Sequence, residues 1–355
     1  MAKELWKGNE AISEAAIKAG CRFFFGYPIT PQNEIPEYMS LRLPQVNGCF
    51  LQAESEVAAI NMVYGAAGSG ARVMTSSSSP GISLKAEGIS YIAGAELPCV
   101  IVNIVRGGPG LGGIQPAQSD YYQACKGGGH GDYRLIVLAP NSVQEAVDLT
   151  QEAFDIADQY RNPVMIVGDG MIGQMMEPVE FREVAKRQLP EKDWATTGTQ
   201  GKRKQRVINS LFIDPQACEN HNIHLFEKYD AIAKNETRVE TYNMEDAELV
   251  FVAYGTTSRI VKNAVNALAK EGIKVGLIRP ITLWPFPSKA IEDAANMSSV
   301  KAFLDVEMSM GQMIDDVKIA VAGKKPVHFY GRTGGMVPTP AAVVEQAKKI
   351  LGGAK

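Results

Sequence analysis

The stretch that decides the fold runs from Leu51 to Gly81 and reads LQAESEVAAINMVYGAAGSGARVMTSSSSPG. An apolar run leads into two acids, Glu54 and Glu56. A helix rich in small apolar residues is expected over about 57–67. A short strand over 71–74 and a turn made by the following serines come next. Charged residues are sparse here, so the carboxylate at the start of this Ala-rich helix calls for an explanation.

Strand and helix patterns alternate on both sides of this stretch. Strands are expected over 21–25, 49–52, 99–105, 133–139 and 164–167, and helices over 8–20, 32–39, 81–92 and 143–157. Such alternation predicts a parallel sheet covered on both faces. Ser142 is predicted to begin the last of these helices, with Glu145 at the capping-box position.

The composition changes further along the chain. Residues 189–245 are polar and turn-rich and contain one amphipathic helical pattern, and a second alternating unit begins at Ala247. The sequence therefore predicts two doubly wound α/β domains, at 1–188 and 246–355, joined by a polar linker with a connecting helix. Each domain falls within the usual size range.

The overall composition excludes several classes of protein. The chain has 355 residues, of which 45% are hydrophobic and 21% charged, and its net charge is -3. There is no excess of basic residues that would indicate nucleic-acid binding, and no apolar run of about 18 residues that would span a membrane. The first residues lack the apolar core of a signal peptide. We expect a cytoplasmic protein that binds neither nucleic acid nor membrane.

The cysteines and glycines exclude further sites. The five cysteines are widely spaced and none form C-x-x-C, which is typical of free thiols. We expect no metal and no iron–sulfur cluster on this chain, so redox electrons would leave through another polypeptide. Gly65, Gly68 and Gly70 do not match the dinucleotide or P-loop spacing, which disfavours a nicotinamide dehydrogenase.

Two loops carry residues suited to binding a ligand. Thr30 lies between Pro28 and Pro31 after a predicted strand, where a hydroxyl can meet a ligand or begin the next helix. Arg106 ends a strand rich in valine and isoleucine and precedes a Gly-rich loop. Its guanidinium suits a carboxylate or phosphate ligand. The alternative for Arg106 is a salt bridge to a neighbouring acid.

Several motifs, in order along the chain, resemble one family. They are Tyr27-Pro28-Ile29-Thr30-Pro31, Glu56 with Gly65, Leu97-Pro98 with Arg106, and Arg279-Pro280 through Leu283-Trp284-Pro285-Phe286-Pro287. Together they resemble the alpha subunit of 2-oxoacid:ferredoxin oxidoreductases, which are thiamine-diphosphate enzymes. The resemblance covers nearly all of the chain. It implies a pyrimidine-binding domain followed by a transketolase C-terminal-like domain.

The resemblance also implies roles for particular residues. Glu56 matches the glutamate that contacts the aminopyrimidine ring of thiamine diphosphate and is the implied catalytic residue, whereas Glu54 is expected at the surface. Thr30 and Arg106 match positions that receive the 2-oxoacid. Four neighbours are candidates for lining the site: Ile29, Gly107, Gln118 and Asp120.

The rest of the active site is implied to lie on other chains. Gly168-Asp169-Gly170 is read as a loop of the first domain, because no metal-binding segment follows it. The resemblance thus implies a beta subunit that binds the diphosphate and shares the thiamine diphosphate. Magnesium and [4Fe-4S] clusters are expected in partner subunits, together with gamma and ferredoxin-like subunits, ferredoxin and CoA.

The implied reaction is oxidative decarboxylation of a 2-oxoacid to an acyl-CoA. The chain looks most similar to 2-oxoisovalerate (branched-chain) members, and 2-oxoglutarate is the alternative. A dicarboxylate would need a second cation, for which Lys85 and Lys126 are candidates, although we expect both at the surface. A non-redox thiamine-dependent decarboxylase and a non-catalytic scaffold subunit remain open.

Overall fold

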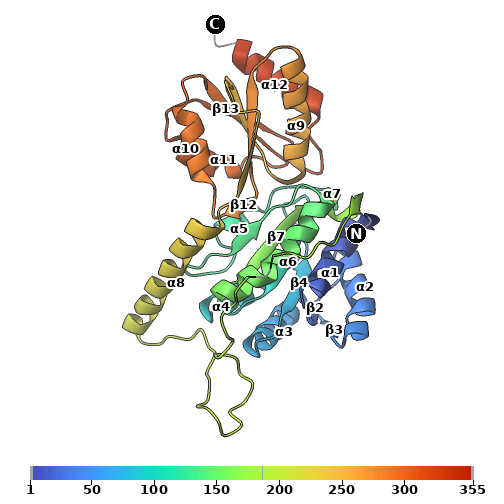
Figure 1. The fold of residues 1–355 in the computed structure, drawn as a ribbon, viewed down its shortest axis with the longest axis vertical. Helices are drawn as coiled ribbons and strands as arrows, with labels where there is room; N and C mark the ends of the chain where they lie inside the picture. The colour runs from blue at the N-terminus through green and yellow to red at the C-terminus, as the bar shows by residue number, and fades with distance from the viewer. Residues whose placement is uncertain (1–2, 186, 353–355) are drawn as a thin grey trace.

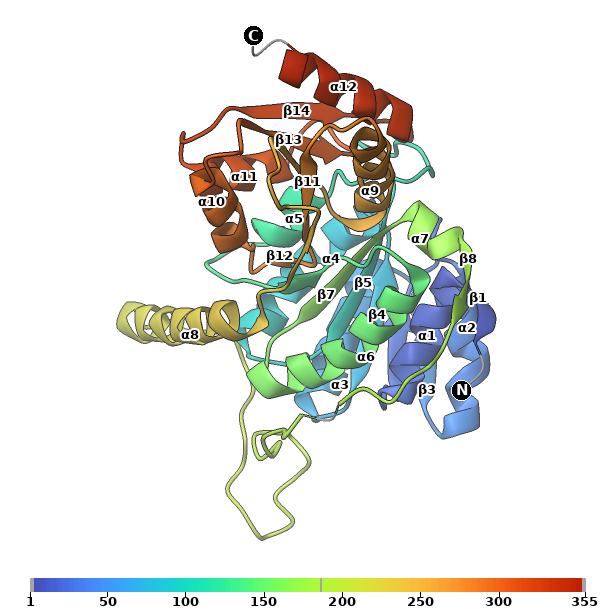
Figure 2. The ribbon, with the colours of Figure 1, turned by 45° about the horizontal axis from the view of Figure 1, so that its top comes forward.

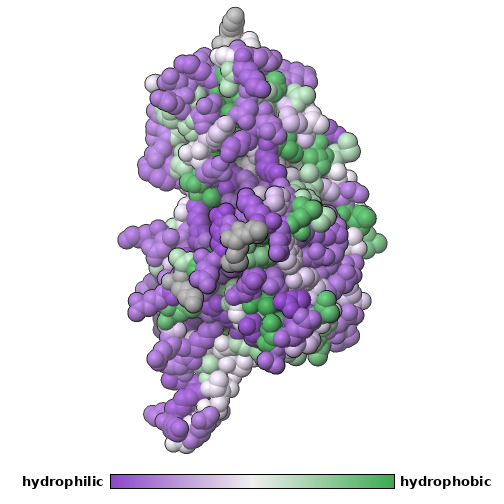
Figure 3. All heavy atoms as spheres, turned by 45° about the vertical axis from the view of Figure 1, so that its right-hand side comes forward, coloured by the Kyte–Doolittle hydropathy of each residue, from purple (hydrophilic) through white to green (hydrophobic). Residues whose placement is uncertain are grey.

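A computed structural model describes residues 3–185 and 187–352. Two α/β units, each built on its own sheet, lie one above the other, and the C-terminal end of the chain belongs to the upper unit (Figure 1). Within the described residues, no helix combines the length and the apolar character needed to cross a membrane. On the face drawn in Figure 3, hydrophilic side chains predominate and apolar atoms form separate patches.

The lower unit is built on a seven-stranded sheet of order β12-β6-β7-β5-β4-β2-β3. Its strands are β2 (Phe23–Gly26), β3 (Cys49–Gln52), β4 (Val73–Ser77), β5 (Val100–Val105), β6 (Ile136–Leu138), β7 (Val164–Asp169) and β12 (Thr282–Trp284). All pairings are parallel except that of β12 with β6. The predicted parallel sheet is therefore confirmed.

Helices cover both faces of this sheet because its central strands are apolar on both sides. In β5, Val102 and Ile104 pack with α1 (Gly8–Lys18), α2 (Glu34–Arg42) and α6 (Val143–Tyr160). Further helices of this unit are η1 (Pro44–Val46), α3 (Glu56–Gly68), α4 (Pro80–Gly94), α5 (Tyr121–Cys125) and α7 (Gly170–Gln174). On the other side of the sheet, side chains of β5, α3 and α4 share one core cluster.

The upper unit has a five-stranded sheet of order β14-β13-β10-β11-β9, in which only β9 runs antiparallel. Its strands are β9 (Val239–Tyr242), β10 (Leu249–Val252), β11 (Val275–Pro280), β13 (Ala302–Glu307) and β14 (Val327–Gly331). Its helices are α9 (Gly255–Lys270), α10 (Ser288–Asn296), α11 (Met313–Val321) and α12 (Pro340–Gly352). Helices α9 and α12 pack together, as do α10 and α11, on opposite sides (Figure 2).

The segment between the units leaves the body of the molecule. A long loop projects beyond the lower unit and returns through α8 (Pro215–Glu236), which agrees with the predicted connecting helix (Figure 1). Its His221 bonds the Gly94 carbonyl at 2.7 Å, and His224 pairs with Glu96 at 3.1 Å. A small antiparallel pair, β1 (Glu4–Lys7) with β8 (Met176–Val179), lies at the N-terminal edge.

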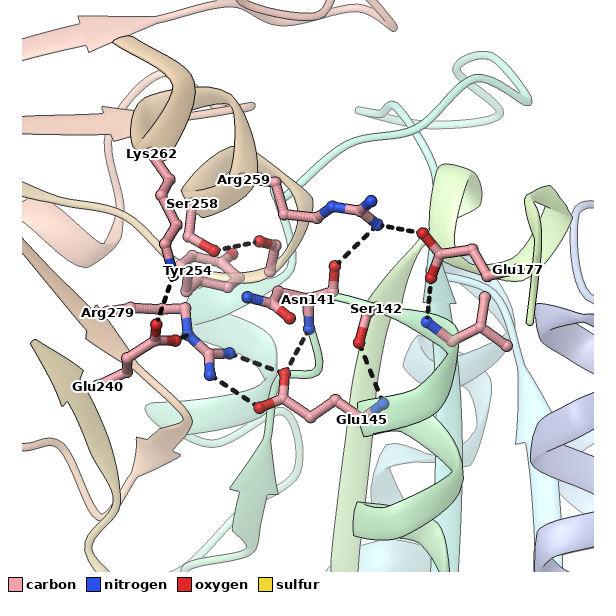
Figure 4. Close-up of polar contacts among 12 residues, drawn as sticks. Asn141, Ser142, Glu145, Glu177, Glu240, Tyr254, Ser258, Arg259, Lys262 and Arg279 are labelled. Atoms are coloured by element: carbon pink, nitrogen blue, oxygen red, sulfur yellow. Dashed lines mark hydrogen bonds and ion pairs between the residues drawn. The ribbon is translucent and has the colours of Figure 1, made fainter. Parts of the chain in front are cut away.

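Polar groups centred on a buried arginine join the two units (Figure 4). Arg279 on β11 donates to both oxygens of Glu145 at 2.8 Å and to Glu240 at 2.7 Å. The Ser142 hydroxyl accepts the Glu145 amide at 3.1 Å, as the predicted cap requires, while the Glu145 carboxylate accepts the Asn141 amide. The Glu145 side chain at the start of α6 therefore also binds the upper unit.

One prediction for the central stretch is wrong. The strand does not end at residue 74, because Ser76 and Ser77 are the last residues of β4, and only Ser78 and Ser79 form the turn that follows. All four serines are buried. Ser76 pairs with Val102 and Ser77 with Asn103 in the register with β5. The backbone thus stays in the sheet, where serines are small enough to leave room at its edge.

Candidate active site

The predicted site residues follow neighbouring parallel strands. Strands β3, β2, β4, β5 and β7 lie side by side in this order, so their carboxyl ends form one edge. Thr30 follows β2, Glu56 follows β3 and Arg106 follows β5. Ligands of open α/β sheets bind at this edge. The fold therefore brings all three residues to the side of the sheet where a ligand is expected.

Glu56 is the first residue of α3 and is 6% exposed, whereas Glu54 is exposed as predicted. Ser55 caps the helix by accepting the Ala58 amide at 3.2 Å. The positive end of the helix favours a carboxylate at this position. Among the described residues, however, no donor makes a hydrogen bond to the Glu56 side chain. A buried carboxyl group without a protein partner can share a proton with a ligand nitrogen, such as the ring nitrogen of the aminopyrimidine of thiamine diphosphate.

Arg106 is held by carbonyl groups. Nη1 donates to the Thr30 carbonyl at 2.9 Å and Nη2 donates to the Leu111 carbonyl at 3.3 Å. The guanidinium forms no ion pair with any described residue, and its buried Nε has no partner there. The salt-bridge alternative is therefore not what the structure contains. An arginine whose charge is not neutralised remains available for an anionic ligand.

A hydrogen-bonded group supports the Arg106 loop. Ser79 donates to Asp120 at 2.7 Å, and its hydroxyl also accepts the Arg106 amide at 3.1 Å. Asn103 donates to the same Asp120 oxygen at 3.0 Å. Burial raises the pKa of Asp120, although the hydrogen bonds from Ser79 and Asn103 act in the opposite direction. Ser79 has a φ of 27°, a region that non-glycine residues rarely occupy, and such strain is concentrated at functional sites.

Two cavities lie in this region, and Arg106 lines the smaller of them. One, of about 290 Å³, is lined by Arg106, Gly107 and Asp120 among others. The other, of about 730 Å³, is lined by the Thr30 turn, by Ile114, Met171 and Met175, and by Val337 of the upper unit. Ile29 is partly buried beside Thr30 but does not line either cavity. Arg106, Gly107, Asp120 and Thr30 thus lie together, as the sequence predicts.

Gln118 lies elsewhere. Its side chain is buried and donates to the Tyr254 carbonyl at 2.9 Å. Its oxygen accepts the Thr257 hydroxyl at 2.8 Å and the Met308 amide at 2.9 Å. The whole amide is therefore used by the upper unit, and Gln118 joins the units instead of lining the cavities beside Arg106.

Asp169 and the lysines complete the placement of the predicted residues. Asp169 ends β7 and caps α7 by accepting the Met171 amide at 2.8 Å, so Gly168–Gly170 belongs to a strand end and a helix start. Lys126 is exposed and pairs with Asp316 at 2.5 Å, as expected of a surface residue. Lys85, in contrast, is completely buried, so its predicted surface position is wrong. Its place on α4, one turn after Gly81, turns it inward.

No sequence pattern predicted that the serines at the end of β4 are buried at the site. Ser77 and Ser78 carry buried hydroxyls without a partner among the described residues, and Ser79 supports the Arg106 loop. The four consecutive serines were the sequence signal for this, because the strands of a parallel sheet are buried and mostly apolar, so polar residues at a strand end are unusual. Across the described parts of the chain, no group of three or more His, Cys, Asp or Glu side chains is arranged to hold a metal ion.

Comparison with known families matches almost the whole chain. Residues 14–244 match the family described as pyruvate flavodoxin/ferredoxin oxidoreductase, thiamine diphosphate-binding. Residues 247–343 match pyruvate:ferredoxin oxidoreductase core domain II. The chain is 52% identical to the ketoisovalerate oxidoreductase subunit VorB of Methanothermobacter marburgensis over 99% of both chains. It is 38% identical to the 2-oxoglutarate synthase subunit KorA of Methanothermobacter thermautotrophicus, over 97% of this chain and 98% of the relative.

Solved structures agree with this assignment. A 2-oxoglutarate:ferredoxin oxidoreductase from Magnetococcus marinus, with 2-oxoglutarate, coenzyme A and succinyl-CoA bound, superposes with a TM-score of 0.87 at 27% identity. The match covers 98% of this chain and 65% of that one. A split-gene transketolase shares the fold at a TM-score of 0.60. The chain therefore belongs to the thiamine-diphosphate-dependent 2-oxoacid:ferredoxin oxidoreductase family.

Proposed function

We propose that this chain is the subunit that presents Glu56 to thiamine diphosphate in a complex that oxidatively decarboxylates 2-oxoisovalerate, or a similar 2-oxoacid, to an acyl-CoA. The observation that carries the proposal is the buried Glu56 carboxylate, which has no described donor and lies at the same sheet edge as the unpaired guanidinium of Arg106. Residues 1–188 would receive the pyrimidine, and residues 246–355 would form the transketolase C-terminal-like domain. The predicted linker 189–245 is shorter in the structure, because β9 already belongs to the upper sheet, and β12 of the second domain joins the lower sheet.

Each of the three residues has a separate task in this proposal. The bound cofactor supplies the electron sink for loss of carbon dioxide from the 2-oxoacid. Glu56 makes the hydrogen bond to the pyrimidine ring nitrogen and holds or releases the proton there. Arg106 binds the substrate carboxylate. The Thr30 carbonyl holds the guanidinium in place at 2.9 Å. The Thr30 hydroxyl would face the substrate.

The charges of the lining residues favour a substrate with one carboxylate. Arg106 is the one Lys or Arg among the described residues that line the two cavities beside it. The larger cavity has an apolar wall of Ile114, Met171 and Met175, and its acid is Glu34. A branched apolar side chain suits such a wall, whereas the distal carboxylate of 2-oxoglutarate would meet no second cation. The identity to the VorB subunit supports the same choice.

An exposed apolar surface beside Glu56 supports a partner that completes the site. Leu51, Val57 and Leu84 expose 40–55% of their surface on β3, α3 and α4. Large exposed apolar side chains that cluster together mark interaction sites. We propose that a beta subunit carrying the diphosphate-binding domain and magnesium covers this surface. Gamma and ferredoxin-like subunits with [4Fe-4S] clusters would pass electrons to ferredoxin in the cytoplasm, where CoA is available.

The proposal is tested by isolating the chain with its native partner subunits. Rates of viologen reduction with CoA are measured for a panel of 2-oxoacids. We expect the highest kcat/KM with 2-oxoisovalerate. A higher value with 2-oxoglutarate would replace the substrate assignment. Carbon dioxide release from every 2-oxoacid without dye reduction would instead support a non-redox decarboxylase.

Glu56→Gln separates catalysis from assembly. Glutamine has nearly the same shape but cannot exchange the proton, so we expect loss of turnover by at least about 100-fold, which is typical for a general acid–base residue. Size-exclusion chromatography should show an intact complex. Full activity in this variant would contradict the role of Glu56 and favour the scaffold alternative.

A further inference from the structure

Lys85 is a completely buried lysine directly behind the candidate site. Its Nζ donates to the Thr75 hydroxyl at 2.7 Å and to the Ser76 carbonyl at 2.9 Å, both on β4. Neither acceptor carries a charge. Within the described residues Lys85 forms no direct ion pair, although a buried ammonium group is costly without a compensating charge. The residue therefore needs a counter-charge close by.

Glu56 supplies that counter-charge. Burial lowers the pKa of Lys85 to about 7, although the nearby negative charge of Glu56 acts in the opposite direction. The two side chains approach from helices that pack against each other, α3 and α4. Two buried charges interact far more strongly than two exposed charges, because little water screens them.

The geometry of α4 brings the two groups together. A methyl group built on Gly81 would lie 2.8 Å from Glu56 Oε1 and 2.0 Å from the Ser77 hydroxyl. The first turn of α4 thus touches the carboxylate. Lys85 is four residues further on and shares this helix face. Ser77 and Ser78 leave their hydroxyls without partners in the same region of the described structure. The ammonium group is therefore anchored on Thr75 and Ser76 of β4, next in sequence to the serine that the first turn of α4 approaches.

We propose that Lys85 is a positioning residue of this site, whose buried ammonium group compensates the charge of Glu56 and holds the carboxylate ready for the aminopyrimidine. This inference rests on the proposed function for its last step. Lys85 touches neither substrate nor cofactor in this assignment and acts through Glu56. Its two hydrogen bonds to β4 hold Nζ in place behind the site.

The test is a double-mutant cycle in the purified complex, with Lys85→Met introduced into the wild type and into the Glu56→Gln variant. Methionine fills the volume of the lysine without its charge. In the wild type we expect Lys85→Met to lower the thermal unfolding midpoint by several degrees and to weaken thiamine-diphosphate binding, measured by calorimetry, about tenfold. In the Glu56→Gln background the ammonium has no counter-charge, so Lys85→Met should raise the midpoint and leave cofactor affinity unchanged.

A purely structural lysine would behave differently. Equal losses of midpoint and of affinity in the two backgrounds would overturn the inference. Lys85→Gln, which keeps a donor for β4 but not the charge, serves as the matched variant and should follow Lys85→Met. If the complex assembles with the double variant but not with Lys85→Met alone, that rescue supports the coupling. Failure of both to assemble would assign Lys85 to packing.

This design separates the inference from the proposed function. The change of sign in the unfolding midpoint needs no substrate and no turnover. A complex that shows the sign change but binds no thiamine diphosphate would retain the Lys85–Glu56 pair and reject the function. A complex that oxidises 2-oxoisovalerate without the sign change would retain the function and reject the pair.

Discussion

Gly81 lies beside the Glu56 carboxylate, where there is no room for a larger side chain. Gly81→Ala would put a methyl group 2.8 Å from Glu56 Oε1 and 2.0 Å from Ser77 Oγ, so both side-chain ends must move. Because these ends can rotate, we expect the protein to fold while thiamine-diphosphate affinity falls about tenfold or more. Gly65→Ala is the control. Its methyl group meets nothing within 4 Å, and alanine stabilises a helix by about 0.5–1 kcal/mol. Equal cofactor affinities in the two variants would contradict the close approach.

The charge of Arg106 is not neutralised by any acidic side chain among the described residues, since its guanidinium bonds two carbonyl groups. In Arg106→Lys the planar fork is lost, although the charge remains. We expect KM for the 2-oxoacid to rise about 10–100-fold, the equivalent of a lost charged hydrogen bond of roughly 1.5–3 kcal/mol. Arg22→Lys is the matched control, since Arg22 also donates to two carbonyls, those of Ile17 and Cys21, but lies at the amino end of β2. An unchanged KM in Arg106→Lys would remove Arg106 from the substrate site.

At the scale of elements, local patterns predicted the central strands and long helices but not how elements cross between units. The continuous apolar run over 99–105 predicted β5, and the capping residues predicted α6. No pattern marked β12, because its three residues gain their partner β6 only through contact with the other unit. The position of Lys85 escaped prediction for the same reason. A lysine has a high exposure on average, and only the packing of α3 on α4 buries this one.

Strand β13 carries a buried acid that gives a pH-dependent stability. Burial, and then the negative charge of Glu307, raises the pKa of Asp305 well above its ordinary value. A carboxyl group with a raised folded pKa contributes stability below its unfolded pKa of about 4, and this contribution is lost as pH rises towards the folded pKa. The asparagine of Asp305→Asn does not titrate. We therefore expect the unfolding midpoint of this variant to increase relative to that of the wild type as pH rises from 4 to 8. Exposed Asp293→Asn is the control, and a constant difference for Asp305→Asn would contradict this prediction.

At the scale of the whole molecule, the two units form one body through a few groups that span their boundary. Both the nitrogen and the oxygen of the Gln118 amide bond residues of the upper unit, and Arg279 pairs with one acid from each unit, Glu145 and Glu240. The wall of the larger cavity is also shared, because Val337 faces the Thr30 turn across it. Motion of one unit against the other would therefore change the shape of the proposed substrate cavity.

Two arginines at this boundary allow a matched test (Figure 4). Arg279 is 5% exposed and Arg259, which pairs with Glu177 at 2.7 Å, is 42% exposed. Arg279→Leu removes the cation that Glu145 and Glu240 share across the boundary. We expect a loss of about 3 kcal/mol in the free energy of unfolding, the lower end for a buried pair, because both acids are only partly buried. Arg259→Leu removes a solvated pair and should cost about 0–1 kcal/mol. Urea unfolding followed by circular dichroism measures both. Similar costs for the two variants would mean that the Arg279 network does not hold the units together, and that β12 and the apolar contacts do so alone.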